Sequence, residues 1–275
     1  MIHSTAVIHP KAKLDSTVQV GPYAVIDADV ELGAGCIVGP HAYLTGLTKA
    51  GKGNYFHAGC SIGNSPQDLK YKGAPTALTI GDHNTFRENT TMNRATFEGE
   101  ATVIGSHNLF MAGVHVGHNC VLGNHLIVAN GAMFGGHVTV EDRAVISGNC
   151  LVHQFCRIGT LAMMQGGSAI SKDLPPFTVA TGHNSICGLN VVGLRRAGFS
   201  AEDRLEVKKL YLALFRSGKN LSEAVAEAQK NFSNARTKVM LDFIAVPTKR
   251  GICADAGYRQ TRQACFWFED QRFHH

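Results

Sequence analysis

The chain has 275 residues, of which 44% are hydrophobic, so it contains enough apolar material for one large or two smaller globular domains. Neither a membrane-spanning helix nor a secretory signal is expected. No stretch approaches about 20 consecutive apolar residues, and no basic segment precedes an apolar one at the N-terminus. The eight cysteines are dispersed without a CxxC pair, which favours reduced thiols and a cytoplasmic location.

The net charge of +5 is unevenly distributed along the chain. Residues 1–186 contain 11 Lys and Arg against 12 Asp and Glu, whereas residues 187–275 contain 15 against 9. The basic excess therefore lies in the C-terminal third, which predicts two regions, the second of which meets an acidic partner. Nucleic acid is not the expected partner, because the basic residues are neither interleaved with stacking aromatic residues nor set in a DNA-binding motif.

A repeat of six residues organises the first two thirds of the chain. Apolar residues occupy every sixth position over residues 2–62, 80–92 and 104–170, in one unbroken register. Six residues match neither the period of an α-helix nor the alternation of a β-strand. We therefore interpret each repeat as a short strand followed by a corner. Three repeats then form a triangular coil of 18 residues, and stacked coils form three parallel sheets.

Two interruptions of the repeat preserve its register. One spans 18 residues from Ile62, and the other spans 12 residues from Met92. They predict loops at residues 64–78 and 93–103, each of which replaces whole repeats. Loops that leave a rigid solenoid at fixed places are common locations of functional residues.

The pattern changes to a helical one after the last repeat. Helices are expected over residues 201–217, after Asn220 and over residues 235–245, with Ser200 as an N-cap and Pro247 ending the last helix. The expected organisation is a β solenoid, a C-terminal helical domain and a tail without a clear pattern, over residues 1–186, 187–250 and 251–275.

The register brings several histidines together. Val116, Phe134 and Val152 are 18 residues apart and are therefore expected to stack on successive coils, about 4.8 Å apart. Histidines adjoin each of these positions, so their side chains are expected near one edge of the solenoid. The predicted cluster consists of His115, His118, His137 and His153.

Five segments of the chain resemble the UDP-N-acetylglucosamine O-acyltransferases, a family of bacterial hexapeptide-repeat enzymes that catalyse the first step of lipid A synthesis. The segments are Gln67–Tyr71, His115–Cys120, Gly135–Val138, Val152–Cys156 and Gly193–Phe199. The resemblance covers residues 1 to about 251. It implies a mainly β fold, namely a left-handed parallel β-helix with a C-terminal helical domain, assembled as a homotrimer.

The resemblance implies transfer of a 3-hydroxyacyl group from an acyl carrier protein thioester to the 3-hydroxyl of UDP-N-acetylglucosamine. It assigns the general base to His118 and the backbone N–H that stabilises the oxyanion to Gly136. Acyl carrier protein is an acidic partner, which fits the basic C-terminal third of the chain. No metal or diffusible cofactor is implied, because the carrier protein holds the phosphopantetheine.

The other predicted site residues also follow from the resemblance. The predicted substrate contacts are Gln67, Asp68, Lys70, His115, His137, His153, Gln154, Asn190 and Arg196. Within this set, the first three would meet the sugar and the diphosphate, and the last two would meet the nucleotide. Gly166 matches the position that limits acyl-chain length in the family.

Three positions depart from the family pattern. Asn119 stands where an aspartate often follows the base, Val192 where an acidic uridine contact is usual, and Ala197 where a second arginine is usual. Three other functions stay open from sequence. They are an N-acyltransferase acting on a 3-amino sugar, although those enzymes carry an additional N-terminal domain, a zinc lyase of the hexapeptide-repeat carbonic anhydrase type, and a purely structural solenoid.

Overall fold

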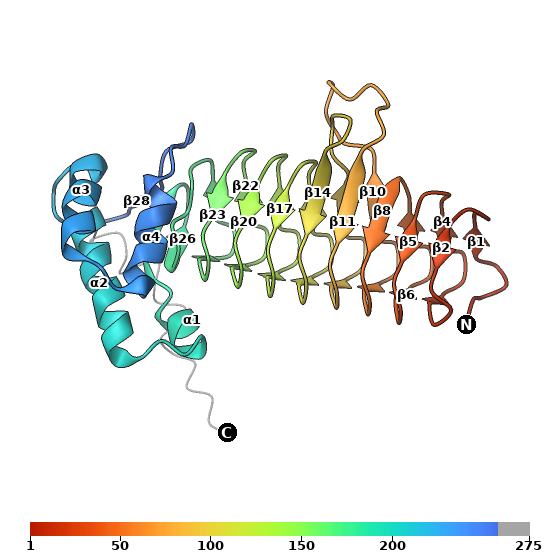
Figure 1. Cartoon of the computed structure of the whole chain (residues 1–275), viewed down its shortest axis with the longest axis horizontal. Helices are drawn as coiled ribbons and strands as arrows, with labels where there is room; N and C mark the ends of the chain where they lie inside the picture. The colour runs from red at the N-terminus through yellow and green to blue at the C-terminus, as the bar shows by residue number, and fades with distance from the viewer. Residues whose placement is uncertain (258–275) are drawn as a thin grey trace.

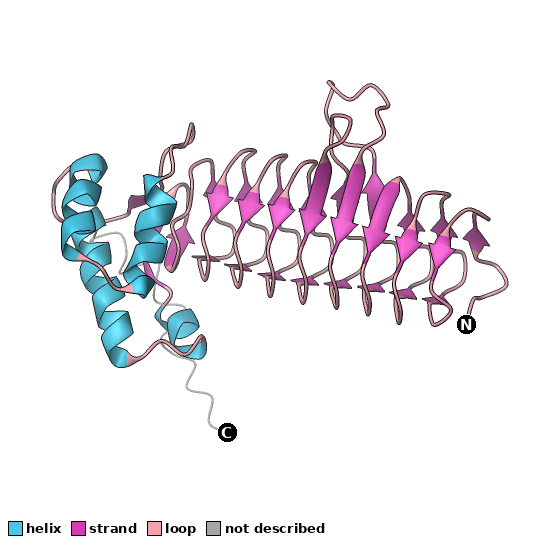
Figure 2. Ribbon diagram, viewed as in Figure 1, coloured by secondary structure: helices cyan, strands magenta, loops and turns pink. Residues whose placement is uncertain are grey.

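The computed structural model describes residues 1–257, in which three parallel β-sheets form the faces of an elongated prism (Figure 1). The chain passes from sheet 1 to sheet 2 to sheet 3 and returns to sheet 1 one coil further along. Helices pack at the C-terminal end of the prism (Figure 2). The expected mainly β fold, a left-handed parallel β-helix followed by helices, is therefore confirmed.

Most strands contain two residues, because each repeat supplies only one side of the triangle. Sheet 1 consists of β1 (Val7–Ile8), β4 (Val25–Ile26), β7 (Tyr43–Leu44), β10 (Ser61–Asn64), β13 (Thr91–Asn93), β16 (His115–Val116), β19 (Met133–Phe134), β22 (Leu151–Val152) and β25 (Ala169–Ile170). Sheet 2 consists of β2 (Lys13–Leu14), β5 (Glu31–Leu32), β8 (Leu47–Ala50), β11 (Ala77–Ile80), β14 (Ala101–Ile104), β17 (Val121–Leu122), β20 (Thr139–Val140) and β23 (Arg157–Ile158). Sheet 3 consists of β3 (Gln19–Val20), β6 (Ile37–Val38), β9 (Tyr55–Phe56), β12 (Thr85–Phe86), β15 (Leu109–Phe110), β18 (Ile127–Val128), β21 (Val145–Ile146), β24 (Met163–Met164), β26 (Thr178–Thr181), β27 (Ser185–Leu189) and β28 (Ala254–Asp255).

The repeat determines both the strand register and the core. Val116 pairs with Phe134, and Phe134 pairs with Val152, so the predicted stack of these three residues is confirmed. The apolar residue of each repeat points into the prism, where one continuous core runs along the axis. Cys120 and Cys150, which occupy the small-residue position of their repeats, are fully buried in that core.

Both inserted loops leave the prism at the edge between sheets 1 and 2. Each interruption makes one step around the prism rather than three, because β10 and β13 lie in sheet 1 whereas β11 and β14 lie in sheet 2. The loops are thus insertions into a corner and do not replace whole coils. They are shorter than expected, at residues 65–76 and 94–100, because the flanking strands extend into them. Both rise together from the prism (Figure 1).

The C-terminal region begins with strands, which the sequence did not indicate. β26 and β27 form an antiparallel hairpin that continues sheet 3. The helices are α1 (Val191–Arg196), α2 (Ala201–Phe215), α3 (Leu221–Asn231) and α4 (Ala235–Ala245). Ser200 caps α2 as expected, in a reciprocal capping box with Asp203. The short helix α1 was not expected.

The segment after α4 returns to the prism as β28, which pairs in parallel with β27. Asp255 accepts hydrogen bonds from the Tyr211 hydroxyl and, at 3.0 Å, from Arg216 Nε of α2. The first residues of the expected tail therefore belong to sheet 3, and residues 258–275 lie outside the described part. The longest helix, α2, has 15 residues, and none of the helices within residues 1–257 is long and apolar enough to cross a membrane.

Candidate active site

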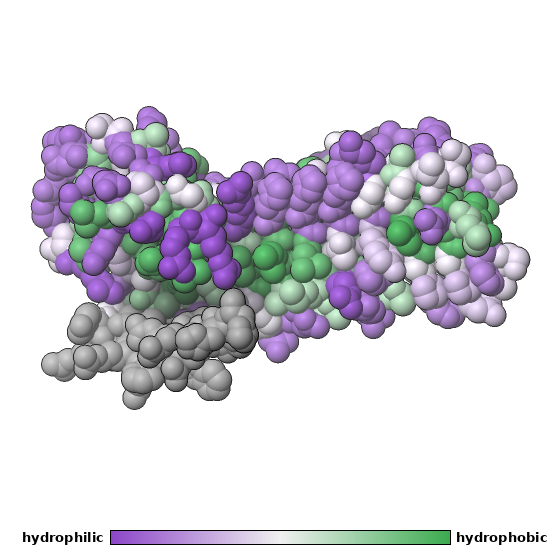
Figure 3. All heavy atoms as spheres, turned by 90° about the horizontal axis from the view of Figure 1, so that it is seen from below, coloured by the Kyte–Doolittle hydropathy of each residue, from purple (hydrophilic) through white to green (hydrophobic). Residues whose placement is uncertain are grey.

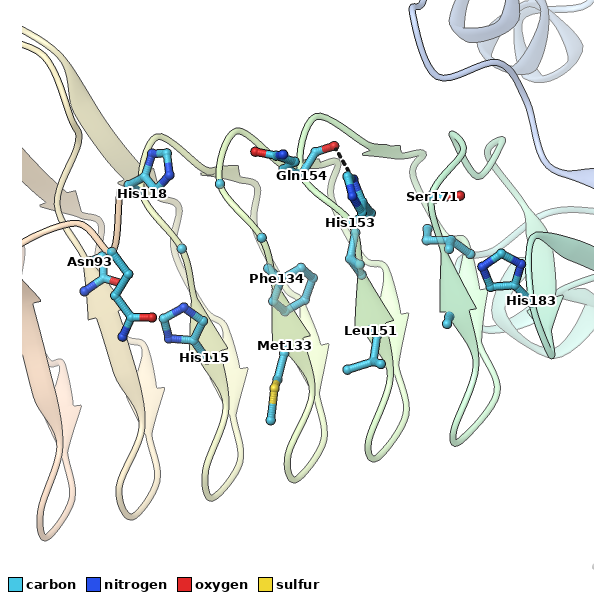
Figure 4. Close-up of a pocket in the computed structure, with 17 residues that line it drawn as sticks. Asn93, His115, His118, Met133, Phe134, Leu151, His153, Gln154, Ser171 and His183 are labelled. Atoms are coloured by element: carbon cyan, nitrogen blue, oxygen red, sulfur yellow. Dashed lines mark hydrogen bonds between the residues drawn. The ribbon is translucent and has the colours of Figure 1, made fainter. Parts of the chain in front are cut away.

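A groove of about 580 Å³ follows the outer face of sheet 1, beside the edge that carries the two loops (Figure 4). Outward-facing strand residues such as Met133 and Leu151 form its floor, and the corner residues that follow those strands form its rim. Six predicted site residues line it together. They are Gln67, His115, His118, Gly136, His153 and Gln154.

The ring of His118 is held from the side facing away from the groove. Its Nδ1 lies 2.9 Å from Asn119 Oδ1 and 2.9 Å from Thr96 Oγ1. The backbone N–H of Thr96 donates to the same Asn119 Oδ1 at 3.0 Å, which identifies this atom as the amide oxygen. Because an amide oxygen only accepts, Nδ1 carries the ring proton. Nε2 therefore keeps its lone pair, as a proton acceptor requires.

Gly136 lies directly against this lone pair. A Cβ atom at position 136 would lie 2.5 Å from His118 Nε2 and 2.6 Å from Cε1, so any side chain there would displace the ring. The backbone N–H of Gly136 donates to no acceptor within residues 1–257. A hydrogen-bond donor and a proton acceptor thus border the same small space.

The other histidines differ in how they meet the groove. His115 lines it, with Nδ1 2.7 Å from Thr91 Oγ1, and His153 lines it with Nδ1 3.2 Å from the Gln154 carbonyl (Figure 4). His137 is outside the lining, because its corner position, with φ of 59°, directs the ring outward. There it contacts His118 edge-on at 5.2 Å and stacks on Phe155 at 4.6 Å.

Burial keeps two of these rings neutral. It lowers the pKa of His115 and of His137, and the neighbouring His118 lowers both further. Near pH 7 these two side chains therefore act as neutral hydrogen-bonding groups. They are suited to contacting a substrate without competing with His118 for its proton.

The first loop brings a carboxylate to the base. Asp68 Oδ2 lies 3.9 Å from His118 Nε2 and accepts a hydrogen bond from Thr96 Oγ1 at 3.4 Å. The backbone N–H of Lys70 donates to Asp68 Oδ1 and, with the nearby His118, lowers the pKa of this carboxyl. The side chain of Lys70 is exposed beside the groove rather than in its lining.

Arg94, which the sequence did not single out, anchors that loop. Its guanidinium donates to the Gly63 carbonyl at 2.8 Å, to Ser65 Oγ at 3.0 Å and to Tyr71 Oη at 2.8 Å. These partners are 23 to 31 residues away in the chain, so no local pattern connects them. Thr96 was missed for the same reason.

A second pocket, of about 850 Å³, lies on the outer face of sheet 3 and against α1. Asn190 and Arg196 line this pocket and not the groove. Both polar ends of the Asn190 amide are engaged, since Oδ1 caps α1 at Gly193 N and Nδ2 donates to the Leu161 carbonyl. Gly166, at the edge between sheets 3 and 1, lines neither cavity. Within one chain, these three predicted residues are thus not brought to His118.

No three His, Cys, Asp or Glu side chains within residues 1–257 are grouped so that they could hold a metal ion. The base and the N–H donor described above are contributed by the chain alone.

Two family models match the chain. One, described as UDP N-acetylglucosamine O-acyltransferase domain 2, matches residues 173–253. The other, described as bacterial transferase hexapeptide (six repeats), matches residues 6–46 and 101–136. Together they span both the prism and the helical region.

Relatives resemble the chain over most of its length. A Janthinobacterium protein named acyl-(acyl-carrier-protein)–UDP-N-acetylglucosamine O-acyltransferase is 45% identical, over 92% of this chain and 98% of its own. One of the same name from Aliarcobacter butzleri is 42% identical, over 91% and 97%. The solved UDP-N-acetylglucosamine acyltransferase of Francisella novicida superposes with a TM-score of 0.88 at 33% identity, covering 100% of both chains.

Proposed function

Because this chain belongs to the UDP-N-acetylglucosamine O-acyltransferase family, we propose that it transfers a 3-hydroxyacyl group from acyl carrier protein to the 3-hydroxyl of UDP-N-acetylglucosamine, with His118 as general base. This reaction is the first step of lipid A biosynthesis. The observation that carries the proposal is the position of His118 Nε2, unprotonated and directly beside Gly136, at the rim of the groove.

The proposed chemistry follows from these two groups. A hydroxyl is a weak nucleophile near neutral pH, so His118 Nε2 takes its proton while the oxygen forms a bond to the thioester carbon. The carbonyl oxygen becomes an oxyanion, which the free N–H of Gly136 stabilises. Collapse of the intermediate breaks the C–S bond, and the imidazolium returns the proton to the departing sulfur of the carrier's phosphopantetheine.

Substrate contacts are assigned to the polar residues around the base. Asp68 accepts from a sugar hydroxyl, while Gln67 and Lys70 extend from the same loop toward the sugar and diphosphate. His115, His153 and Gln154 line the groove further along the prism, and His137 borders its rim. The neutral state of His115 and His137 supports hydrogen-bonding roles for them.

A homotrimer is part of the proposal, because a single chain leaves the site divided. The groove faces outward from sheet 1, whereas the pocket with Asn190 and Arg196 faces outward from sheet 3. In a closed ring of three copies, sheet 3 of one copy meets sheet 1 of the next, which would join the two half-sites three times. Such an arrangement would also bring Gly166 of one copy toward the groove of another.

The chemistry of the prism faces supports this arrangement. Outward residues of sheet 3 are mainly apolar, and Ile127 is 43% exposed. A hydrophobic area is visible on the face seen from below (Figure 3). The other apolar members of that face are Ile37, Tyr55, Leu109, Val145 and Met163. Sheet 2 presents Lys13, Glu31, Lys49 and Arg157 instead, which suits contact with water.

The carrier protein is proposed to dock on the basic helical region. Within the described residues, several basic groups of α2 are already neutralised, since Lys209 pairs with Glu206 and Arg216 with Asp255. Lys208 forms no ion pair within residues 1–257 and is exposed. It is therefore the most available positive charge on this helix for an acidic partner. The buried thiols of Cys36, Cys60, Cys120, Cys150, Cys156 and Cys253 support the cytoplasmic location included in the proposal.

Product analysis tests the reaction. The purified protein is incubated with a 3-hydroxyacyl carrier protein thioester and UDP-N-acetylglucosamine, and the product is examined by mass spectrometry before and after mild alkali. We expect an added 3-hydroxyacyl group that alkali removes, as an ester requires. An alkali-stable product formed only from the 3-amino sugar would instead identify an N-acyltransferase.

A further inference from the structure

The amide of Asn119 joins the base to a carboxylate on the second loop. Its Oδ1 lies 2.9 Å from His118 Nδ1, and its Nδ2 donates to Glu100 Oε2 at 2.6 Å. The family pattern places a carboxylate directly beside the base, and this chain has an amide there with a carboxylate one hydrogen bond further away. The charge missing at position 119 is therefore present at position 100.

The orientation of this chain of groups is determined by its ends. Glu100 can only accept when ionised, so Asn119 Nδ2 must donate to it, and Asn119 Oδ1 must then face His118. The backbone of Asn119 is held as well, since its N–H donates to Thr102 Oγ1 at 2.8 Å. A second backbone bond, from Phe97 N to Glu100 Oε2 at 3.4 Å, keeps the carboxylate in reach.

We propose that Glu100 is a positioning residue that, through Asn119, fixes the ring of His118 and stabilises its protonated form during acyl transfer. The inference rests on the proposed function, because it concerns the state that His118 reaches after accepting the substrate proton. When the imidazolium forms, Nδ1–H donates to Asn119 Oδ1 while the amide donates to Glu100. Each hydrogen bond in the relay strengthens as the charge on the ring develops.

Several other charged or titratable groups face His118 and set the scale of the effect. Asp68 approaches Nε2 from the first loop, His115 and His137 flank the ring on the neighbouring coils, and Lys70 lies further out. Glu100 raises the pKa of His137 in opposition to burial, so its charge reaches this cluster. Glu100 is itself exposed, and its influence on the ring is accordingly modest and sensitive to salt.

The test is the pH dependence of kcat/KM in the full-length chain. Glu100→Gln keeps an oxygen that can accept from Asn119 but removes the charge, so the acid limb of the profile should move to lower pH by about 0.2–0.7 unit. The displacement should shrink as salt is added. Glu98→Gln is the matched control, because Glu98 is an exposed carboxylate of the same loop outside the relay.

Exchange of the two groups gives an independent reading. Asn119→Asp alone places two carboxylates in contact, so it should lower kcat more than Glu100→Gln does. Combining the two substitutions restores a donor opposite a carboxylate, since the amide introduced at position 100 can donate to the carboxylate introduced at position 119. The double variant should therefore exceed the Asn119→Asp variant in activity, with an acid limb at higher pH than that of the wild type.

Identical acid limbs for Glu100→Gln and Glu98→Gln, or additive effects of the two exchanged positions, would overturn the relay. A merely structural role would lower the melting temperature without moving the limb. Failure of the proposed function has a different signature: the wild-type protein would not acylate UDP-N-acetylglucosamine at any pH.

Discussion

Two rows of histidines follow edges of the prism, and they have different surroundings. His83, His107 and His125 lie on successive coils at the edge between sheets 2 and 3, with ring centroids 5.2 and 5.1 Å apart and nearly parallel planes. His118 and His137 occupy the edge between sheets 1 and 2, where the same coil spacing brings their rings together edge-on at 5.2 Å.

The difference lies in what leaves the prism beside each row. Both loops emerge at the second edge, on the two coils before His118, and they supply Thr96 and Asp68 to its ring. The first row has no such insertion, and its rings stack on one another. Coil spacing alone therefore produces rows of like residues, whereas the inserted loops turn one row into a site.

The largest expected effect distinguishes the two rows directly. His118→Ala should lower the turnover rate by about 10²–10⁴, because it removes the proton acceptor, whereas His107→Ala should leave it unchanged. Steady-state rates with the carrier thioester measure this. Both variants should keep the wild-type melting temperature within a few degrees. More than a tenth of normal activity in His118→Ala would show that another group is the base.

The next effect tests whether the loop, rather than the row, organises the site. Arg94→Met removes a charged donor with three partners, so kcat/KM for the UDP-sugar should fall about 10–100-fold while the prism stays folded. Arg87→Met is the matched control, because Arg87 pairs only with exposed Glu88 and should change kcat/KM less than about twofold. Equal losses in the two variants would contradict the anchoring role.

A third effect concerns the periodic part of the chain at Gly166. This residue lies 48 residues after His118, about 2.7 coils or roughly 13 Å along the axis. Gly166→Met should shorten the preferred acyl chain by about three to four carbons, at roughly 1.2 Å per bond. Gly148→Met, at the same corner one coil nearer the base, should shorten it further. Rates for a series of acyl chain lengths measure both, and an unchanged optimum would remove Gly166 from the acyl groove.

The smallest effect separates the helical region from the prism. Lys208→Glu with Lys209→Glu should raise the KM for the carrier thioester several-fold and flatten its salt dependence, with the UDP-sugar KM unchanged. Lys11→Glu with Lys13→Glu applies the same charge reversal at the far end of the prism and should change neither constant. A donor KM that responds equally to both pairs would place the carrier away from α2.

The prism could be predicted from sequence because its interior repeats. Residues such as Val116 and Phe134 must face inward on every coil, and this requirement leaves a period that a single chain displays. The hairpin of β26 and β27 could not be predicted, because those strands pair without the repeat. β28 lies in sheet 3 through contacts with Tyr211 and Arg216, more than thirty residues away.

The site was predicted where it depends on the repeat and missed where it depends on the loops. His115, His118 and His153 share a groove because the coil spacing aligns them. His137 stands outside its lining, since a left-handed corner residue turns its side chain outward, a detail that spacing does not carry. Arg94, Thr96 and Glu100 reach the site from a loop, and nothing in the order of their neighbours indicates where that loop folds.

The insertion of both loops at one corner also determines how this chain tolerates changes of length. Six residues that fold as a strand and a corner carry the chain onto the next sheet, so adding them would rotate everything downstream by a third of a revolution about the prism axis. Six residues added to residues 94–100 would leave β14 on sheet 2 and rotate nothing. His153 thus keeps its bearing relative to His118 when a loop lengthens, and loses it when the intervening prism gains a number of repeats that is not a multiple of three.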